Sequence, residues 1–195
     1  MKAYYERRAR EYDDWYLGRG RFAERDRPGW DEEVDELRRA LQALPPARTL
    51  DVACGTGFLT RHLPGAIVGL DQSESMLALA RARVPEATFV RVDALPLPFP
   101  GDSFERIFTS FFYGHLGEED RLDFLSQARH VAGELVVVDS ALNEEHEPVE
   151  WQERVLKDGS TWQVYKRFFT AAVLAEELGG GETLCESRWF VAFRC

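Results

Sequence analysis

The sequence predicts an α/β fold built on a mainly parallel β-sheet, and three observations lead to this prediction. Short apolar runs alternate with helix-like segments from residue 49 to residue 139, which is typical of parallel strands joined by right-handed crossovers. The last of these runs, residues 134–139, is apolar enough to lie in a sheet that is covered on both faces. Third, the stretch Leu50–Gly57 has the sequence of a short apolar strand followed directly by a tight turn of small residues.

Length and composition limit the classes of protein that fit. A chain of 195 residues with 45% hydrophobic content predicts a single domain, residues 1–195, with a full core. The formal net charge of −10 argues against a nucleic-acid or anionic-membrane partner, because affinity for phosphates comes mainly from clustered Lys and Arg. The N-terminal arginines alternate with acids, which predicts a solvated face whose charges compensate one another. These arginines are Arg7, Arg8, Arg10, Arg19 and Arg21.

The cysteines and the apolar runs predict a cytoplasmic protein. Cys54, Cys185 and Cys195 are widely separated and lack metal-ligand spacing, which favours reduced thiols and no metal site. The first residues lack the apolar core of a signal peptide, and no apolar run approaches the roughly 20 residues that cross a bilayer. Cys54 is expected to fill the crowded turn rather than to act as a nucleophile.

Residues 1–30 are rich in aromatic and charged residues, and two interpretations stay open for them. Tyr5, Tyr12 and Tyr16 are spaced for one broad helical face. This spacing fits a helix packed over the edge of the sheet, and it also fits a lid whose rings close over a ligand. Residues 31–44 carry apolar side chains at helical spacing before two prolines, which predicts an amphipathic helix that ends there.

The apolar runs are the expected strands, and the segments between them are the expected helices. Residues 58–63 are expected to start a helix directly after the first strand. Ser73 is the expected N-cap of a helix that ends near residue 83. A further helix over 118–130 is expected to point Leu122 into the core. The expected strands cover about 49–53, 66–71, 88–92, 106–111 and 134–139.

The pattern changes in the last quarter of the chain. Residues 145–170 are expected to form an inserted cap, with a β-hairpin over 151–169 whose turn is a favourable Asp-Gly pair. The hairpin is also a candidate homodimer contact, because Trp151 and its aromatic neighbours otherwise form an exposed apolar patch. Thr170 is the expected cap of a helix that a run of glycines ends. Two final strands follow, at about 182–188 and 190–194.

We expect the ligand site at the carboxyl ends of the parallel strands, where ligands bind in such sheets. Gly55 and Gly57 let a ligand approach the backbone closely, and the amides of the expected helix start favour a polar or anionic group. Asp71 can accept hydrogen bonds from two ribose hydroxyls. Asp93 and Ser110 end two further strands, so four positions converge on one edge of the sheet.

Four motifs together resemble those of class I S-adenosylmethionine (SAM)-dependent methyltransferases, most closely the small-molecule branch that includes the ubiquinone and menaquinone methylases. The stretch Leu50–Gly57 resembles their glycine motif, and Gly69–Ser73 followed by Met76 resembles their second-strand motif. Asp93–Phe99 is similar to their adenine loop and Asp102–Arg106 to their fourth motif.

This resemblance covers about residues 50–140, and it implies a Rossmann-like sheet of seven strands with an antiparallel last strand and helices on both faces. Residues 1–30 and 145–170 match only as variable caps, which we expect to form an N-terminal lid and a hairpin insertion.

The resemblance also implies how individual residues bind SAM. Asp51 and the backbone of the glycine motif hold the methionine part, Asp71 the ribose, and Met76 and Asp93 the adenine. Ala53 replaces the first glycine of the family's motif, and its methyl group is expected to require an ordinary φ at that residue. The predicted SAM-binding residues are Tyr12, Tyr16, Asp51, Ala53, Cys54, Gly55, Gly57, Asp71, Gln72, Met76, Asp93, Ala94, Leu95 and Ser110.

The implied reaction is an in-line displacement at the methyl group of SAM, with S-adenosylhomocysteine (SAH) as product. The protein then mainly aligns the nucleophile and excludes water. His115, five residues beyond Ser110, is the candidate general base, which an acceptor hydroxyl or acidic carbon requires. A loop histidine without a catalytic role is the other interpretation, and Tyr113 is a second candidate.

Two other functions fit parts of the pattern. A nicotinamide oxidoreductase requires glycine at the position of Thr60 in the dinucleotide fingerprint, so this alternative is disfavoured. A non-catalytic SAM-binding protein is not excluded by any residue. The aromatic residues in both caps predict a small, partly apolar methyl acceptor.

Overall fold

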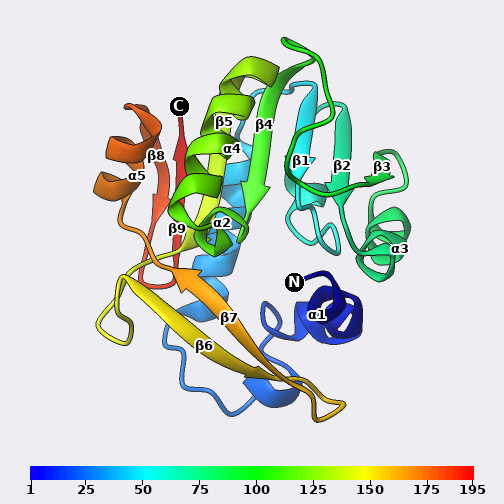
Figure 1. Ribbon diagram of the computed structural model, residues 1–195. Helices are drawn as coiled ribbons and strands as arrows, with labels where there is room; N and C mark the ends of the chain where they lie inside the picture. Colours follow the sequence, from blue (N-terminus) through cyan, green and yellow to red (C-terminus); the bar gives the residue numbers. More distant parts are fainter.

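The computed structural model describes residues 1–195, and its sheet has the predicted architecture (Figure 1). Seven strands follow the order β3-β2-β1-β4-β5-β9-β8. The first five along the chain pair in parallel, whereas β9 pairs antiparallel with both β5 and β8. The strands are β1 Thr49–Val52, β2 Ile67–Asp71, β3 Thr88–Arg91, β4 Phe104–Ser110, β5 Ala132–Ser140, β8 Glu182–Glu186 and β9 Phe190–Arg194.

Two of the helices, α3 and α5, begin at the capping residues that the sequence predicts. The hydroxyl of Ser73 accepts a hydrogen bond from the backbone amide of Met76 at the start of α3, and Thr170 caps α5 through Val173 in the same way. Gly179 ends α5 with a φ of 79°. The α-helices are α1 Lys2–Arg8, α2 Trp30–Gln42, α3 Glu74–Arg83, α4 Glu118–Val131 and α5 Ala171–Leu178, and the 3₁₀ helices are η1 Ala9–Asp14, η2 Gly20–Phe22, η3 Thr60–His62 and η4 Tyr113–His115.

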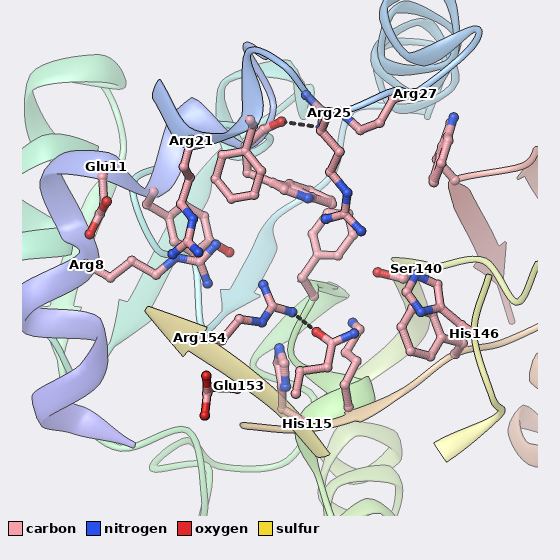
Figure 2. Close-up of a pocket in the computed structure, with 18 of the residues that line it drawn as sticks. Arg8, Glu11, Arg21, Arg25, Arg27, His115, Ser140, His146, Glu153 and Arg154 are labelled. Atoms are coloured by element: carbon pink, nitrogen blue, oxygen red, sulfur yellow. Dashed lines mark hydrogen bonds between the residues drawn. The ribbon is translucent and has the colours of Figure 1, made fainter. Parts of the chain in front are cut away.

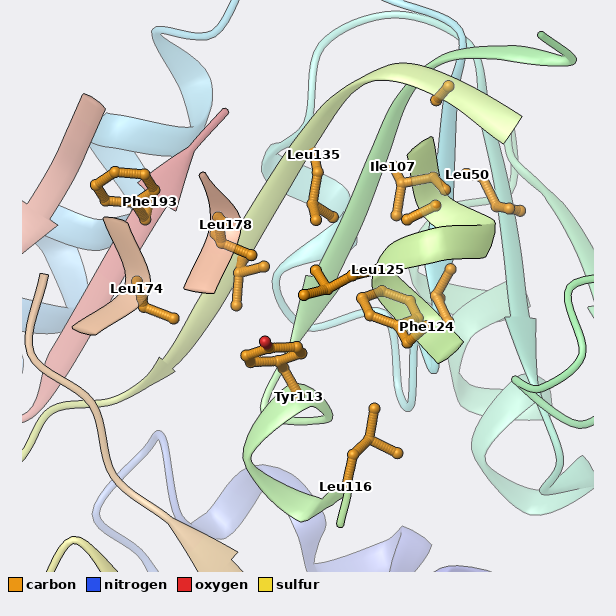
Figure 3. Close-up of a cluster of buried hydrophobic side chains, with 14 of the residues drawn as sticks. Leu50, Ile107, Tyr113, Leu116, Phe124, Leu125, Leu135, Leu174, Leu178 and Phe193 are labelled. Atoms are coloured by element: carbon orange, nitrogen blue, oxygen red, sulfur yellow. The ribbon is translucent and has the colours of Figure 1, made fainter. Parts of the chain in front are cut away.

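Two hydrophobic clusters fill the two sides of the sheet. In the larger cluster, side chains of α4 and α5 such as Phe124 and Leu174 pack on strand residues such as Ile107 (Figure 3). On the other face, Leu37 and Leu41 of α2 pack with side chains from β4, β5 and β9. Helices therefore cover both faces, as the apolar strand sequences predict.

The caps lie together at the carboxyl ends of the parallel strands (Figure 1). One is the hairpin of β6 Val149–Val155 and β7 Thr161–Arg167, and the other is the N-terminal segment, residues 1–30. Tyr4 of α1 joins the two caps, because it packs with Leu156 and Val164 of the hairpin in a small buried cluster. Segments from opposite ends of the chain thus cover the edge at which the sequence predicts a ligand site.

Two local predictions are wrong. Residues 58–63 do not start an α-helix: only the short helix η3 forms, at Thr60–His62, and Phe58 packs into the core near α2 instead. Leu122 points away from the core and is 64% exposed, because Phe124 and Leu125 of α4 already cover the sheet. None of the helices combines the length and the apolar character that crossing a membrane requires.

Candidate active site

The glycine turn, residues 53–57, begins directly after β1 and has a left-handed backbone at three of its residues. The φ angles are 60° at Ala53, 55° at Gly55 and 71° at Gly57. The prediction of an ordinary φ at Ala53 is therefore wrong. The turn imposes the left-handed conformation on this residue in spite of its methyl group, which costs roughly 1–2 kcal/mol in an L-residue.

Asp71, at the end of β2, holds the glycine turn in place. One carboxylate oxygen accepts a 3.0 Å hydrogen bond from the amide of Gly55, and the other accepts a 2.8 Å bond from the amide of Ser73. Burial raises the pKa of this carboxyl group, although the two amide bonds oppose that effect. Each oxygen keeps a second lone pair, so the carboxylate can still accept further hydrogen bonds.

Asp51, on β1, has one carboxylate oxygen without any partner. Its Oδ2 accepts a 2.6 Å hydrogen bond from the hydroxyl of Thr60, whereas Oδ1 is buried and unpaired. Burial, the largest cause, and the nearby negative charge of Asp71 together raise the pKa of Asp51 to about 7, although the hydrogen bond from Thr60 opposes them. A buried acceptor beside a second carboxylate favours a cationic ligand group, such as an ammonium.

The other predicted SAM-binding residues are divided between buried and exposed positions. Met76 is buried at the start of α3, and Ser110 ends β4 in a half-buried position. Asp93 is exposed in the loop after β3, while Ala94 and Leu95 pack against the core cluster under α4. All of them lie on segments at or just beyond the carboxyl ends of β2, β3 and β4.

The N-terminal segment closes over the glycine turn. The hydroxyl of Thr56 donates a 2.6 Å hydrogen bond to Asp13, which also forms an ion pair with Arg83 of α3. Tyr12 lies next to the turn, 3.9 Å from the position that a Cβ atom on Gly55 would take. Tyr16 is buried and stacks on Phe58 with ring centroids 4.0 Å apart, so it attaches the segment to the hydrophobic core.

These residues fit SAM. The unpaired oxygen of Asp51 suits the ammonium group of its methionine part, and Asp71 has free lone pairs for ribose hydroxyls. The left-handed backbone at Gly55 leaves no side chain between the ligand and the turn. Tyr12 lies where an aromatic ring covers a ligand bound along the turn.

A cavity of about 670 Å³ lies on the far side of Tyr12 from the glycine turn, whose own residues do not line it. Its walls come from the N-terminal segment, from the hairpin and from the loops after β4 and β5 (Figure 2). Tyr12 connects the two places, because it lines the cavity and also lies beside Gly55. A cavity of this size takes a small organic molecule.

The cavity is lined by five arginines, and none of them forms an ion pair with a carboxylate. The prediction of a solvated, self-compensating N-terminal face is therefore wrong for Arg8, which is half-buried, whereas Arg21 is exposed to solvent. The physical reason is that the N-terminal segment folds back over the sheet edge, so that Arg8 approaches Arg154 of β6. The five are Arg8, Arg21, Arg25, Arg27 and Arg154.

His115 lines the same cavity and is fixed in one tautomer. Its Nδ1 lies 2.6 Å from the carbonyl oxygen of Tyr165, and a carbonyl only accepts, so the proton is on Nδ1 and Nε2 carries a lone pair. Burial lowers the pKa of His115 well below its ordinary value, and the charge of Lys166 lowers it further. The imidazole is thus neutral at neutral pH.

Lys166 and Asp139 form a buried ion pair beneath the cavity floor. Asp139 lies next to the last residue of β5, and its carboxylate also accepts a 2.8 Å hydrogen bond from the amide of Gly114. The pair fixes the hairpin to the sheet edge and neutralises the charge of Lys166. No signal in the sequence links these two residues, which are 27 positions apart.

Two candidate residues are excluded from the chemistry by their surroundings. Tyr113 is buried in the core under α4 and donates a 2.7 Å hydrogen bond to Glu177, away from the cavity. Cys54 is buried in the turn, and burial raises the pKa of its thiol well above the ordinary value, so it fills space as predicted.

Comparisons with known proteins agree with this geometry. Residues 49–134 match the family described as "Methyltransferase domain". A demethylmenaquinone methyltransferase of Thermus thermophilus is 38% identical over 104 residues, which are 48% of this chain and 47% of that protein. A dTDP-3-amino-3,6-dideoxy-alpha-D-glucopyranose N,N-dimethyltransferase of Streptomyces fradiae is 35% identical over 135 residues, 65% of this chain and 50% of that protein. The chain thus spans about half the length of these curated relatives.

Solved structures match nearly the whole chain. The structure described as "DhpI-SAM-HEP complex" aligns with a TM-score of 0.79 and 25% sequence identity. The alignment covers 99% of this chain and 94% of that one. The N-terminal segment and the hairpin are therefore part of the shared architecture.

Proposed function

We propose that this chain, in which residues 49–134 match a methyltransferase domain, is a class I SAM-dependent methyltransferase of the quinone-methylase type and transfers the methyl group of SAM to a small-molecule acceptor held in the cavity. One observation carries this proposal: Tyr12 lies beside a turn with the residues that SAM requires, and it also lines the cavity. The dinucleotide fingerprint of an oxidoreductase is absent, since Thr60 takes the place of its third glycine.

The chain binds SAM through its own acceptors and backbone. Asp71 receives the ribose hydroxyls, the free oxygen of Asp51 receives the ammonium, and Met76 and Asp93 contact the adenine. When bound, SAM supplies an activated methyl group on a sulfonium. The closed N-terminal segment then excludes water, and the cavity aligns the nucleophile with the methyl group.

His115 acts on the acceptor rather than on SAM. His115 lines the cavity, and its Nε2 is free to accept a hydrogen bond because Nδ1 donates to the carbonyl of Tyr165. We propose that this nitrogen accepts the hydrogen bond of an acceptor hydroxyl or amine and thereby orients the attacking lone pair.

The relatives narrow the class of acceptor without naming it. By their names, one acts on demethylmenaquinone and another on a dTDP-amino sugar, and both compounds are small molecules. We propose a small-molecule acceptor and no nucleic acid, because the cavity is lined by segments of one chain and is enclosed on several sides. A cytoplasmic location fits the free thiols of Cys54 and Cys185.

The proposed organisation is one domain with two caps, residues 1–30 and residues 145–170. The hairpin is the proposed homodimer contact, and its Trp151 is 68% exposed. Trp162 is half-buried against Tyr4 instead, so the contact depends on Trp151. Sedimentation velocity of the native chain and of Trp151→Ser tests it, and a native monomer contradicts it.

Calorimetric titration with SAH, with NAD in a parallel run, tests the proposed cofactor. We expect saturable binding of SAH alone. Asp71→Ala should weaken it by roughly 1.5–3 kcal/mol, the range for hydrogen bonds to a charged group. Asp120→Ala, an exposed acid on α4, is the matched control and should bind SAH normally.

Turnover of an acceptor panel with labelled SAM then separates an enzyme from a non-catalytic SAM-binding protein. Native SAH binding without any turnover across quinols, amines and phosphorylated acceptors favours the non-catalytic alternative. Binding of NAD instead of SAH refutes the proposal.

A further inference from the structure

The arginines of the cavity outnumber the carboxylates that line it with them, and this imbalance deepens the function proposed above, on which the inference rests. Five arginines face three glutamates, Glu11, Glu24 and Glu153. Lys166 adds no net charge, because Asp139 neutralises it. The lining therefore has an excess of two positive charges, in a chain whose formal net charge is −10.

The same excess is found when only the more enclosed groups are considered. Arg21, Arg25, Glu24 and Glu153 are exposed to solvent. The remaining charges are Glu11 and three half-buried arginines. Two positive charges again lack a partner, and they lie where solvent screens them least.

Arg27 has a structural role in the fold. Its guanidinium lies 3.7 Å from the ring centroid of Trp30 and donates a 2.8 Å hydrogen bond to the carbonyl oxygen of Trp15. It therefore anchors the N-terminal segment to α2, although its charge still contributes to the field in the cavity.

Neither Arg8 nor Arg154 has a carboxylate partner, although the guanidinium of Arg8 lies 5.5 Å and 4.8 Å from the ring centroids of Tyr4 and Tyr12. Arg8 donates one 2.6 Å hydrogen bond to the hydroxyl of Tyr4, and Arg154 bonds only to the neighbouring Gln152. Burial and the charge of Arg8 both lower the pKa of Arg154, so the two cations repel each other across the cavity. Arg8 enters it from the N-terminal segment and Arg154 from β6 (Figure 2).

A pair of cations that repel each other in a partly buried place is stabilised by an anion between them. A guanidinium has five N–H donors, most of which are unused here, and its planar fork matches the oxygens of a phosphoryl or phosphonyl group. The excess of two charges matches a dianion rather than a monoanion. The cavity volume admits a small organic molecule attached to such a group.

We propose that Arg8 and Arg154 bind a doubly charged phosphate or phosphonate group of the methyl acceptor, which orients the acceptor toward the glycine turn. Neutral apolar compounds then lack the group that the cavity recognises. The aromatic residues of the two caps predict a partly apolar acceptor, and aromatic rings line the cavity beside the arginines.

The test uses three small probes with the SAH-saturated chain above neutral pH: methylphosphonate, methyl phosphate and acetate. We expect saturable binding of at least one dianion and at least tenfold weaker binding of acetate. Arg8→Gln and Arg154→Gln should each weaken the dianion about tenfold or more. The dianion preferred by the native chain distinguishes phosphonate from phosphate.

The matched control is Arg10→Gln, an exposed arginine of η1 without a hydrogen bond or ion pair. It should keep native affinity for the dianion, and all three variants should keep native affinity for SAH, which shows that they are folded. No saturable dianion binding, or equal losses in Arg10→Gln and Arg154→Gln, overturns the inference.

Failure of the proposed function gives a different result. If the native chain does not bind SAH, the methyltransferase proposal fails, and the dianion titration is repeated without SAH to decide on the arginine site alone. If SAH binds and the dianions do not, only the inference about the acceptor fails.

Discussion

The hydroxyl of Thr56, in the glycine turn, donates a 2.6 Å hydrogen bond to the carboxylate of Asp13 in the N-terminal segment. Arg83 of α3 forms an ion pair with the same carboxylate and donates a 2.6 Å hydrogen bond to the carbonyl oxygen of Thr56. Asp13 therefore fastens the segment over the site where SAM is proposed to bind. We therefore expect the segment to open when SAM enters or SAH leaves.

Asp13→Asn should loosen this closure. The substitution removes the charge from two part-buried hydrogen bonds, each worth roughly 1.5–3 kcal/mol when charged. We expect faster cleavage by trypsin within residues 1–30 and faster release of SAH, measured by stopped-flow fluorescence. Asp14→Asn is the control, because Asp14 pairs with the exposed Lys157, and such surface pairs contribute little. Equal protease sensitivity of the two variants contradicts a specific role of Asp13.

Ala53→Gly should stabilise the protein. Glycine relieves the left-handed strain at this position, roughly 1–2 kcal/mol, and loses roughly 0.5–1 kcal/mol through its more flexible unfolded chain. The free energy of unfolding in urea should therefore rise by about 0.5–1 kcal/mol. Ala78→Gly, in an exposed position within α3, should lower it by about 1 kcal/mol. A loss of stability in both variants contradicts the strain at Ala53.

Much of the fold could be predicted because its signals are local. Ser73, Thr170 and Gly179 cap helices through contacts with residues only a few positions away. Asp71 follows from the period of the strands, since it ends an apolar run beside a glycine turn. The wrong prediction for residues 58–63 has a physical cause, because Phe58 gains more from burial near α2 than from continuing a helix.

The cavity could not be predicted, because its walls come from distant parts of the chain. Arg8 and Arg154 are 146 positions apart, and nothing in their local sequence indicates that they meet. Alternating charges around Arg8 favour a solvated helix on local grounds. Only the packing of Tyr4 on the hairpin turns that helix so that Arg8 enters the cavity.

The affinity for SAH should rise as the pH rises toward about 7. Asp51 has its pKa raised to about 7, chiefly by burial, so its carboxyl group is largely protonated below that pH. The ammonium group of SAH binds the ionised form of Asp51 better than the protonated form. SAH binding below pH 7 therefore releases a proton from Asp51, and the gain in affinity levels off above pH 7. Calorimetry in two buffers of different ionisation enthalpy measures the proton directly.

Asp51→Asn should abolish both the proton release and the pH dependence. Asp93→Asn, which alters an exposed acid, should lower the affinity for SAH, but this affinity should keep its dependence on pH. If Asp51→Asn shows the native pH dependence, another group is responsible for it, and Asp51 does not contact the ammonium.

His115→Gln should lower kcat by about 100-fold, within the range for a lost acid–base group, and leave the affinity for SAH unchanged. His115 donates to the Tyr165 carbonyl through Nδ1 and offers the lone pair of Nε2 to the acceptor. Glutamine has no basic nitrogen that can take the place of Nε2. Because burial and Lys166 lower the pKa of His115 well below its ordinary value, the native kcat should stay level between about pH 6 and pH 8. His130→Gln, on the exposed side of α4, should retain native kcat. An acid limb of kcat near pH 6.5 that disappears in His115→Gln means that the imidazole is not held neutral. A loss of less than threefold limits His115 to lining the cavity.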